Sequence, residues 1–247
     1  AGDLAEAIHE RQFRVYYQPI VGARGERRVE ALVRWLHPRH GLLAPGLFIG
    51  LAEQTGTITA LTLWVLEEAL GQMRAWAEAG LSIGVAVNLS VETLRDAMFP
   101  DYVRAMLRRF GVARGQLTLE VTETALMSRP QEASAVLEQL VGEGVRVAID
   151  DFGVGYSSLQ YLRRLPVQEI KVDRSFLSES FAGGDPALLG AIIRLGGALG
   201  LSVVVEGVER QELSDWLLPL EGEPGNLLFQ GYLYGRPMPA DQLVAFG

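Results

Sequence analysis

Acidic and amide side chains stand at or near the ends of short β-branched runs along this 247-residue chain. Carboxylate and amide oxygens are the ligands that Mg2+, Mn2+ and Ca2+ prefer, whereas zinc sites draw on cysteine and histidine. The chain has no cysteine, and its three histidines form no ligand set. Gathered at one site, these oxygens would bind hard divalent cations. The positions are Glu30, Asn88, Glu120, Glu123, Asp150, Asp151, Asp173, Glu206 and Gln230.

Two adjacent aspartates, Asp150 and Asp151, end one of these runs. Such a pair can share its oxygens between two ions, an arrangement that serves in-line displacement at phosphorus. Arg34 lies four residues after Glu30 on the same strand face, and a guanidinium is suited to grip a phosphate oxygen. Each acid alone also has a plain explanation, because a carboxylate after a strand can cap the next helix. The set as a whole favours metal-assisted phosphoryl chemistry.

The chain contains one lysine, Lys171, beside 21 arginines. The lysine ammonium is a compact point charge, while the guanidinium is a planar fork that is always charged. A position that keeps the ammonium suggests a site that needs this group, although one lysine can also survive by chance on a surface. Lys171 lies twenty residues after Asp151. Beside metal ions, its ammonium would orient an attacking water or neutralise developing charge.

The β-branched runs alternate with helical patterns, and eight strands with crossover helices in about 250 residues indicate a (β/α)8 barrel. Only a polar turn at 21–27 separates the first two strands, which is too short for a parallel crossover. We therefore expect an α/β fold, a modified TIM (β/α)8 barrel with one antiparallel strand near the N-terminus. The expected strands are 13–20, 28–35, 83–90, 116–123, 145–150, 168–173, 202–206 and 226–232. The expected helices are 59–79, 92–110, 131–143, 156–164, 186–199 and 209–218, with surface turns at 182–186 and 221–226.

The composition allows a packed core, with 49% hydrophobic and 21% charged residues. The formal net charge of −8 argues against a broad basic surface for binding nucleic acid polymers. No apolar run is long enough for a membrane span, and no secretory leader is visible. We expect residues 1–247 to form one domain cut from a longer protein. The absence of cysteine fits the cytoplasm, either free or as the cytoplasmic part of a membrane-anchored protein.

Nine sequence blocks follow one another along nearly the whole chain. They are YYQPI at 16–20, VEALVRWLHPRHG, PGLFIGLAEQTG, VNLS at 87–90, LEVTET at 119–124, DDFGVGYSSLQYL at 150–162, IKVD at 170–173, EGVE at 206–209 and QGYLYGRPMP at 230–239. In this order they resemble the EAL domain family, the cyclic di-GMP phosphodiesterase domain of bacterial signalling proteins. The triplet Glu30-Ala31-Leu32 gives the family its name and carries no weight alone, but the nine blocks together are highly specific.

The resemblance implies a role for each matched position. The ligands of a first metal ion match Glu30, Asn88, Glu120 and Asp150, and Asp150 with Asp151 matches a second metal site. Lys171 matches the lysine that contacts the catalytic water, and Glu206 the proposed general base. Glu123 matches the acid that anchors the loop after the fifth strand. The substrate-contacting positions match Gln18, Arg34, Asp173, Glu209 and Gln230.

The implied reaction is hydrolysis of one phosphodiester bond of cyclic di-GMP to linear pGpG. The implied cofactors are two Mg2+ or Mn2+ ions, with Ca2+ inhibitory, and the implied partner is a second copy in a homodimer. Residues 151–158 match the loop that links metal binding to dimerisation.

Two other functions stay open: a catalytically weak cyclic di-GMP receptor, and a scaffold whose dimerisation is its output. Receptors of this kind usually lose a metal ligand, the lysine or the base, and this chain keeps all of them. An uncovered apolar patch on helix 156–164 would favour the scaffold.

The chain departs from the family pattern at Val154, Val172 and Val205, and in a longer interval between Glu209 and Gln230. None of these departures removes an implied metal ligand. Val154 lies in the loop expected to couple assembly to activity, and Val205 is expected to crowd the strand beside Glu206.

Overall fold

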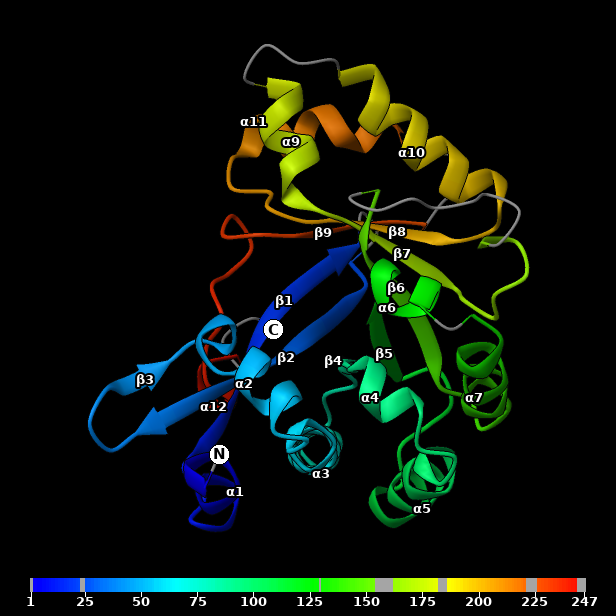
Figure 1. Ribbon diagram of the computed structural model, residues 1–247. Coiled ribbons are helices and arrows are strands. Elements are labelled where there is room, and N and C mark those ends of the chain that lie inside the picture. The colour runs from blue at the N-terminus through cyan, green and yellow to red at the C-terminus, as the bar shows by residue number, and fades with distance from the viewer. Residues whose placement is uncertain are drawn as a thin grey trace.

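The computed structural model describes residues 2–22, 25–128, 130–153, 162–181, 186–220 and 226–243. Within these ranges eight strands close into a barrel, and a ninth, β3, pairs with β2 outside it (Figure 1). The strands are β1 Phe13–Gly22, β2 Arg27–His37, β3 Gly41–Leu43, β4 Gly84–Asn88, β5 Leu117–Thr122, β6 Arg146–Phe152, β7 Glu169–Val172, β8 Ser202–Val205 and β9 Leu227–Gln230. The predicted modified TIM barrel is confirmed.

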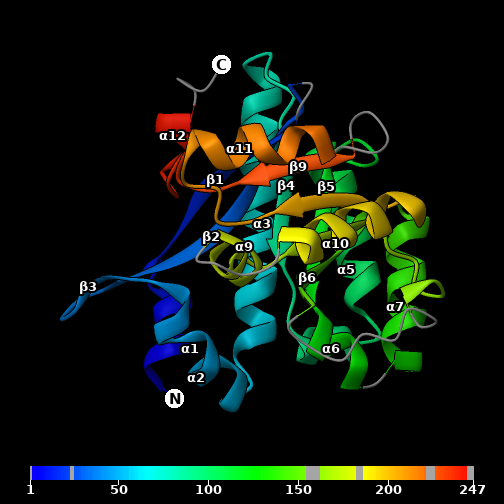
Figure 2. The ribbon, with the colours of Figure 1, turned by 90° about the horizontal axis from the view of Figure 1, so that it is seen from above.

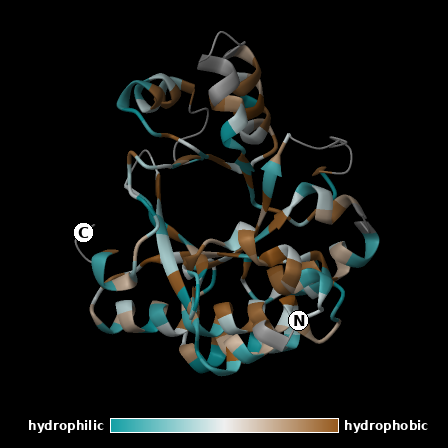
Figure 3. Cartoon of the chain, turned by 60° about the vertical axis from the view of Figure 1, so that its left-hand side comes forward, coloured by the Kyte–Doolittle hydropathy of each residue, from teal (hydrophilic) through white to brown (hydrophobic). Residues whose placement is uncertain are grey.

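Helices surround this barrel, with α3, α5 and α7 on one side and α10 and α11 on the other (Figures 1 and 2). Brown and teal residues alternate along them in Figure 3, as amphipathic helices require. The helices are α1 Gly2–His9, α2 Ile49–Gln54, α3 Ile58–Glu78, α4 Val91–Leu94, α5 Phe99–Phe110, α6 Glu123–Ser128, α7 Pro130–Gly142, α9 Arg174–Phe181, α10 Pro186–Ala198, α11 Gln211–Leu217 and α12 Ala240–Leu243, with 3-10 turns η1 Pro45–Leu47 and η2 Leu218–Leu220. In the part of the chain described, no helix combines the length and apolar character of a membrane span.

The antiparallel strand is β1, which pairs with β2 on one side and β9 on the other. Gln18 lies opposite Glu30 of β2, and Ile20 lies opposite Gln230 of β9. Strand β1 therefore brings the polar ends of β2 and β9 close together. The other neighbouring strands of the barrel run parallel. Their carboxyl ends therefore meet at one mouth, as the strand-end residues require.

The eight predicted strands are confirmed to within about two residues, but the helix predicted over 92–110 is wrong. It is two helices, α4 and α5, because Pro100 has no N–H and would clash with the carbonyl four residues earlier in a continuous helix. The helix predicted at 156–164 lies almost wholly outside the described residues, as do most of the two predicted turns.

Of the departures from the family pattern, Val205 and Val172 are fully buried on β8 and β7. Both pack in the main hydrophobic core between strands and helices rather than inside the barrel. Val154 lies outside the described residues.

The barrel interior has three layers, because every second residue of a strand points inward. Ile20, Ala86, Val204 and Leu228 form a small apolar cluster separate from the main core. The residues two positions from these toward the carboxyl mouth are all polar: Gln18, Asn88, Glu206 and Gln230. Glu30, Glu120 and Lys171 are buried at the same end of the neighbouring strands. Arg28 and Glu169 lie two residues before Glu30 and Lys171 on the same strands and form a second charged layer with Arg146. On β6 the buried Ala148 lies between Arg146 and Asp150, so apolar residues of neighbouring strands separate the two charged layers.

Helix α10 packs closely on β8 at Gly196, and substitution of this glycine tests that contact. A Cβ at Gly196 would overlap the side chain of Val203, whereas a Cβ at the neighbouring Gly197 meets nothing within 4 Å. We expect Gly196→Ala to lower the free energy of unfolding by about 1–3 kcal/mol because it overpacks this contact. Gly197→Ala should instead be neutral or raise it by up to about 1 kcal/mol, because alanine favours helix. Urea denaturation of both variants checks this; equal effects would contradict the close approach.

Candidate active site

We call the charged layer nearest the carboxyl mouth the upper layer and the one farther from it the lower layer. The ammonium of Lys171 lies at the centre of the upper layer, with only 1% of its side chain exposed. Its Nζ is 2.8 Å from Glu206 Oε1 and 2.9 Å from Glu120 Oε2. It is 3.4 Å from both Glu30 Oε2 and Asp150 Oδ1. These acids come from β2, β5, β6 and the residue after β8, so one buried cation gathers carboxylates from around the barrel.

Amide side chains hold Glu30 from the other side. Asn88 Nδ2 donates a hydrogen bond to Glu30 Oε1 at 2.6 Å, and Gln230 Nε2 donates to Glu30 Oε2 at 2.6 Å. Gln230 Nε2 also lies 3.2 Å from Gln18 Oε1, and Gln18 Nε2 donates to the carbonyl of Gly235 at 3.2 Å. The Glu30 carboxylate is therefore fixed by donors from β4, β7 and β9. Asn88 makes its bond to Glu30 through its amide nitrogen, so its amide oxygen takes no part in it.

The ionisation of these groups follows from burial and from the single cation. Burial alone would raise the pKa of Glu30, but Lys171, Gln230 and Asn88 outweigh it and hold the pKa below its ordinary value. Burial raises the pKa of Glu120 well above its ordinary value, and Glu30 and Asp150 add to the effect against Lys171. Burial alone would lower the pKa of Lys171, but the surrounding acids raise it well above its ordinary value.

The two outermost acids of the cluster also have raised pKa values. Burial raises the pKa of Glu206 to about 7, with Asp150 and Glu30 adding to the shift. Burial, Asp150 and Asp173 raise the pKa of Asp151. Five carboxylates thus face one ammonium, and the negative charge is under-compensated.

This cluster fits divalent cations by its donor set. Among the described residues, Glu120 Oε1 is buried without a hydrogen-bond partner, so one acceptor of this acid is unused. As the side chains stand, no three His, Cys, Asp or Glu residues within the described ranges are arranged to hold a metal ion, since the acids close on Lys171 instead. The unpaired oxygen, the excess negative charge and the oxygen-only donors are nevertheless what Mg2+ or Mn2+ would satisfy.

Asp151 interrupts the regular strand just before the end of β6. Its φ is 54°, in the left-handed region that non-glycine residues seldom adopt, although asparagine and aspartate adopt it more often than most. Its N–H donates to Asp150 Oδ1 at 3.0 Å, and the register between β6 and β7 shifts between Ile149 and Phe152. In a regular strand Asp150 and Asp151 would point to opposite faces, because successive side chains alternate. The irregular backbone here allows both to lie at the barrel mouth.

Glu123 begins α6 directly after β5 and is buried, with 1% exposed. Its Oε2 accepts a hydrogen bond from the backbone N–H of Gly153 at 2.9 Å. This carboxylate thus ties the chain that leaves β6 to the end of β5.

Several predicted substrate positions line a small cavity of about 200 Å3 next to the cluster. Leu32, Arg174 and Tyr232 also line it, and the sequence reasoning missed all three. Arg174 had one available signal, since it directly follows the KVD block. The predicted residues in this cavity are Gln18, Glu30, Glu206, Glu209 and Gln230.

Arg34 and Asp173 line neither this cavity nor the larger one beside it. Arg34 is half-buried, its guanidinium lies 5.7 Å from the ring centre of Tyr16, and its Nη1 donates to the Val33 carbonyl. Burial lowers the pKa of Arg34, while Tyr16 and Glu30 oppose that shift. Asp173 Oδ1 accepts from the N–H of Ser175 at 2.9 Å, so in this structure it caps the start of α9.

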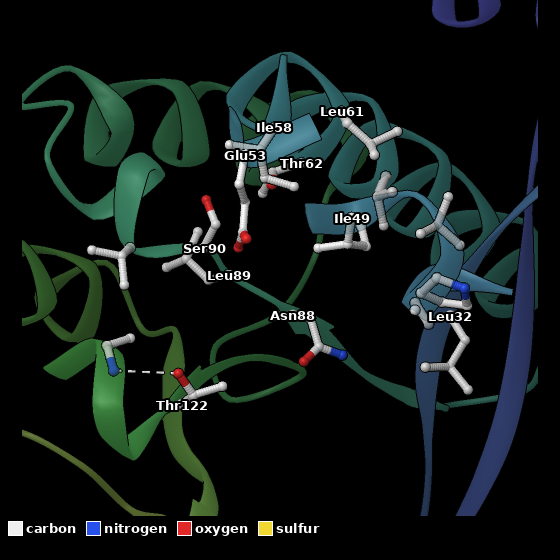
Figure 4. Close-up of a pocket in the computed structure, with 17 residues that line it drawn as sticks. Leu32, Ile49, Glu53, Ile58, Leu61, Thr62, Asn88, Leu89, Ser90 and Thr122 are labelled. Carbon is white, nitrogen blue, oxygen red and sulfur yellow. Dashed lines mark hydrogen bonds between the residues drawn. The ribbon is translucent and has the colours of Figure 1, made fainter. Parts of the chain in front are cut away.

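The larger cavity, of about 400 Å3, has mainly apolar walls from β2, α2, α3 and β4. Glu53 of α2 and Asn88 of β4 both reach it, as Figure 4 shows, and Leu32 lines both cavities. Since Asn88 bonds Glu30, which lines the smaller cavity, the two cavities adjoin at the acid cluster. Glu53 was missed by sequence reasoning, although it lies in the PGLFIGLAEQTG block.

A (β/α)8 barrel with one antiparallel strand and a lysine-centred carboxylate cluster at its mouth defines the class of this protein. The chain belongs to the EAL domain family, whose family model matches residues 1–237. Among curated proteins of Pseudomonas aeruginosa, the bifunctional diguanylate cyclase/cyclic di-GMP phosphodiesterase MucR is 46% identical over 98% of this chain and 36% of its own length. The cyclic di-GMP phosphodiesterase NbdA is 45% identical over 99% of this chain and 31% of its own length.

This chain therefore spans about a third of the length of these two relatives. A solved structure of the PaMucR phosphodiesterase in complex with c-di-GMP superimposes with a TM-score of 0.91 at 46% identity, covering 98% of both chains. The EAL enzyme Bd1971, bound to cAMP and cyclic di-GMP, gives a TM-score of 0.89 at 28% identity, covering 99% of this chain and 67% of that one.

The hydrogen bond from Gly153 to Glu123 can be tested directly. Glu123→Gln keeps the size and an acceptor oxygen but removes the charge that strengthens this bond. We expect the Gly153 amide to exchange with solvent at least about tenfold faster, because bonds to charged acceptors are worth about 1.5–3 kcal/mol. Hydrogen exchange followed by NMR measures this, with Glu138→Gln on the exposed face of α7 as the control. Unchanged protection of Gly153 would show that the carboxylate does not hold this segment.

Proposed function

We propose that this chain hydrolyses one phosphodiester bond of cyclic di-GMP to give linear pGpG, using two divalent cations. The observation that carries the proposal is the set of carboxylates from four places around the barrel that converge on one buried lysine. The named activities of MucR, NbdA and the PaMucR complex support it. In the longer proteins of this kind, residues 1–247 would act as one cytoplasmic output domain.

The oxygen donors divide into two proposed metal positions. Glu30, Asn88, Glu120 and Asp150 would hold the first ion, and Asp150 would share the second with Asp151. When bound, Mg2+ or Mn2+ lowers the pKa of water and polarises phosphoryl oxygens. Ca2+ would occupy the same acids with little turnover, since its looser and larger coordination shell positions water less well.

Lys171 and Glu206 would act on the attacking water. Their contact of 2.8 Å places a proton donor and a proton acceptor side by side at the mouth. The ammonium would hold the water oxygen and offset charge that develops on the phosphate, while a Glu206 oxygen would accept the water proton. Arginine would not reproduce this role, because its guanidinium is a larger planar fork that spreads the charge, whereas the ammonium is a compact point charge.

The substrate would lie across the two cavities. A guanine base has an apolar ring face and two adjacent N–H donors on one edge. Leu32 and Ile49 offer apolar walls in the larger cavity, and the Glu53 carboxylate offers two acceptors for such an edge. Gln18, Glu209 and Gln230 of the smaller cavity would contact the ribose and phosphate side. Arg34 and Asp173 would join these contacts only after leaving the partners they have here.

A homodimer is also proposed, with the segment after β6 as its link to the metal site. Glu123 supports this link, because it binds Gly153 at the root of that segment.

One assay tests the function. Purified protein is incubated with cyclic di-GMP and Mg2+, Mn2+, Ca2+ or chelator, and products are separated by chromatography. We expect pGpG with Mg2+ or Mn2+, little with Ca2+ and none with chelator. Glu120→Gln serves as the inactive control, since it removes a proposed ligand and keeps the shape. Tight binding of cyclic di-GMP without any product would refute the enzyme and leave a receptor.

Lys171→Arg tests the role of the ammonium. We expect turnover to fall by about 100-fold or more, as when one preorganised donor is lost, while the fold and metal binding remain. Turnover, circular dichroism and calorimetric Mn2+ titration measure these three quantities. Arg109→Lys, at the exposed pair with Glu67, is the matched control and should be fully active. A fully active Lys171→Arg enzyme would exclude a specific need for lysine.

A further inference from the structure

The lower layer of the barrel interior holds a buried ion-pair group centred on Glu169. This residue is fully buried on β7. Its Oε2 lies 2.8 Å from Arg28 Nη2 of β2 and 3.6 Å from Arg146 Nη2 of β6. The guanidinium groups also reach hydroxyl oxygens, at 3.3 Å for Arg28 to Thr118 of β5 and 3.4 Å for Arg146 to Ser202 of β8.

These five strands also supply the upper layer, with the charges reversed. In the upper layer β7 contributes a cation, Lys171, and the acids come from β2, β5, β6 and the end of β8. In the lower layer β7 contributes an anion, Glu169, and cations come from β2 and β6.

Two ion pairs therefore connect β7 to β2, one in the upper layer and one in the lower layer. In the ring of strands, β7 and β2 are separated by β6, β5 and β4 on one side and by β8, β9 and β1 on the other. Both the Arg28–Glu169 pair and the Glu30–Lys171 pair thus cross the barrel interior. The members of each strand are two residues apart on one face, about 7 Å along the strand. An apolar cluster lies between the two levels.

The register of β7 with β8 sets the height of Lys171 along the strand, but the acids of the upper layer do not by themselves select one position for its ammonium. Four carboxylates contact the ammonium within a narrow range of distances, so a small shift of β7 would exchange one partner for another. The pairing of β7 with β6 is itself irregular, with a register shift between Ile149 and Phe152. The lower layer has no such ambiguity, because Glu169 is its single anion among the described contacts.

We propose that Glu169 is a positioning residue: its ion pairs with Arg28 and Arg146 fix β7 across the barrel and thereby set where the Lys171 ammonium lies among the acids. The inference rests on the proposed function, since Lys171 matters to turnover only if the cluster is the active site. It assigns a role to residues that touch neither substrate nor metal, on the far side of the apolar layer.

The single lysine makes the test direct. Protein labelled with 13C at lysine Cε gives one lysine signal, which reports the surroundings of Lys171 alone. We expect Glu169→Gln to shift or broaden that signal and to lower kcat on the order of tenfold to a hundredfold, as a small misplacement of a catalytic group does. KM for cyclic di-GMP should stay nearly unchanged, because Glu169 contacts no part of either substrate cavity.

Leu140→Val in α7 is the control, because it also removes buried contacts but lies outside the barrel. It should lower thermal stability without moving the lysine signal or kcat. If Glu169→Gln loses stability alone, with an unmoved signal and unchanged kcat, Glu169 is only structural and the proposal is overturned.

Two further measurements cover a variant that does not fold and a parent protein that shows no hydrolysis. If Glu169→Gln does not fold, Arg146→Gln loosens the same layer from its longer and partly exposed contact, with 32% of the Arg146 side chain exposed. It should move the lysine signal in the same direction, and an unmoved signal would reject the inference. If the parent protein shows no hydrolysis, the proposed function fails while the NMR signal still decides whether Glu169 positions Lys171.

Discussion

The buried Lys171 ammonium is the contact on which the rest of this site depends. An isolated charge inside a protein costs several kcal/mol, so the ammonium persists only because carboxylates surround it. The strand ends bring those carboxylates together, and the cation between them offsets their mutual repulsion. One cation cannot balance the four acids that contact it, and an oxygen of Glu120 has no hydrogen-bond partner within the described part of the chain. The lysine therefore stabilises the folded barrel mouth, and the remaining negative charge there attracts divalent cations.

A parallel barrel suits this task because it separates the groups that pack from the groups that react. Outward-facing residues such as Ile170, Val172 and Val205 build the main core with the helices. The inward-facing residues of the same strands form the charged layers, with a thin apolar layer between them. Side chains from strands far apart in sequence then meet at fixed heights, since strand register sets the height of each residue. Arg28 and Glu169 lie 141 residues apart, yet they form a contact of 2.8 Å.

Sequence patterns predicted the strands well because alternation and β-branched runs are local signals. The convergence of Glu30, Glu120, Asp150 and Lys171 was also predictable, since the carboxyl ends of parallel strands meet at one mouth. Other features depend on contacts between distant segments. Short helices such as α2 and α6 give too few turns for a periodic signal, and Pro100 alone marked the break between α4 and α5. Nothing local distinguishes Glu169 from a surface acid, because its partners lie on β2 and β6. The left-handed Asp151 likewise follows from tertiary structure rather than from residue type.

The arrangement of the two cavities constrains what can bind. Leu32 lines both, and the 2.6 Å bond between Asn88 and Glu30 joins the wall of the larger cavity to the wall of the smaller one. A ligand that fills both must therefore pass directly over the acid cluster. Its middle must be anionic enough to attract bound cations, because bare carboxylates would repel it. Its end in the larger cavity must be flat and largely apolar, with donors for Glu53. A nucleobase linked through a phosphodiester has this order of chemistry, whereas a simple sugar phosphate lacks the apolar end and a lipid lacks the donors.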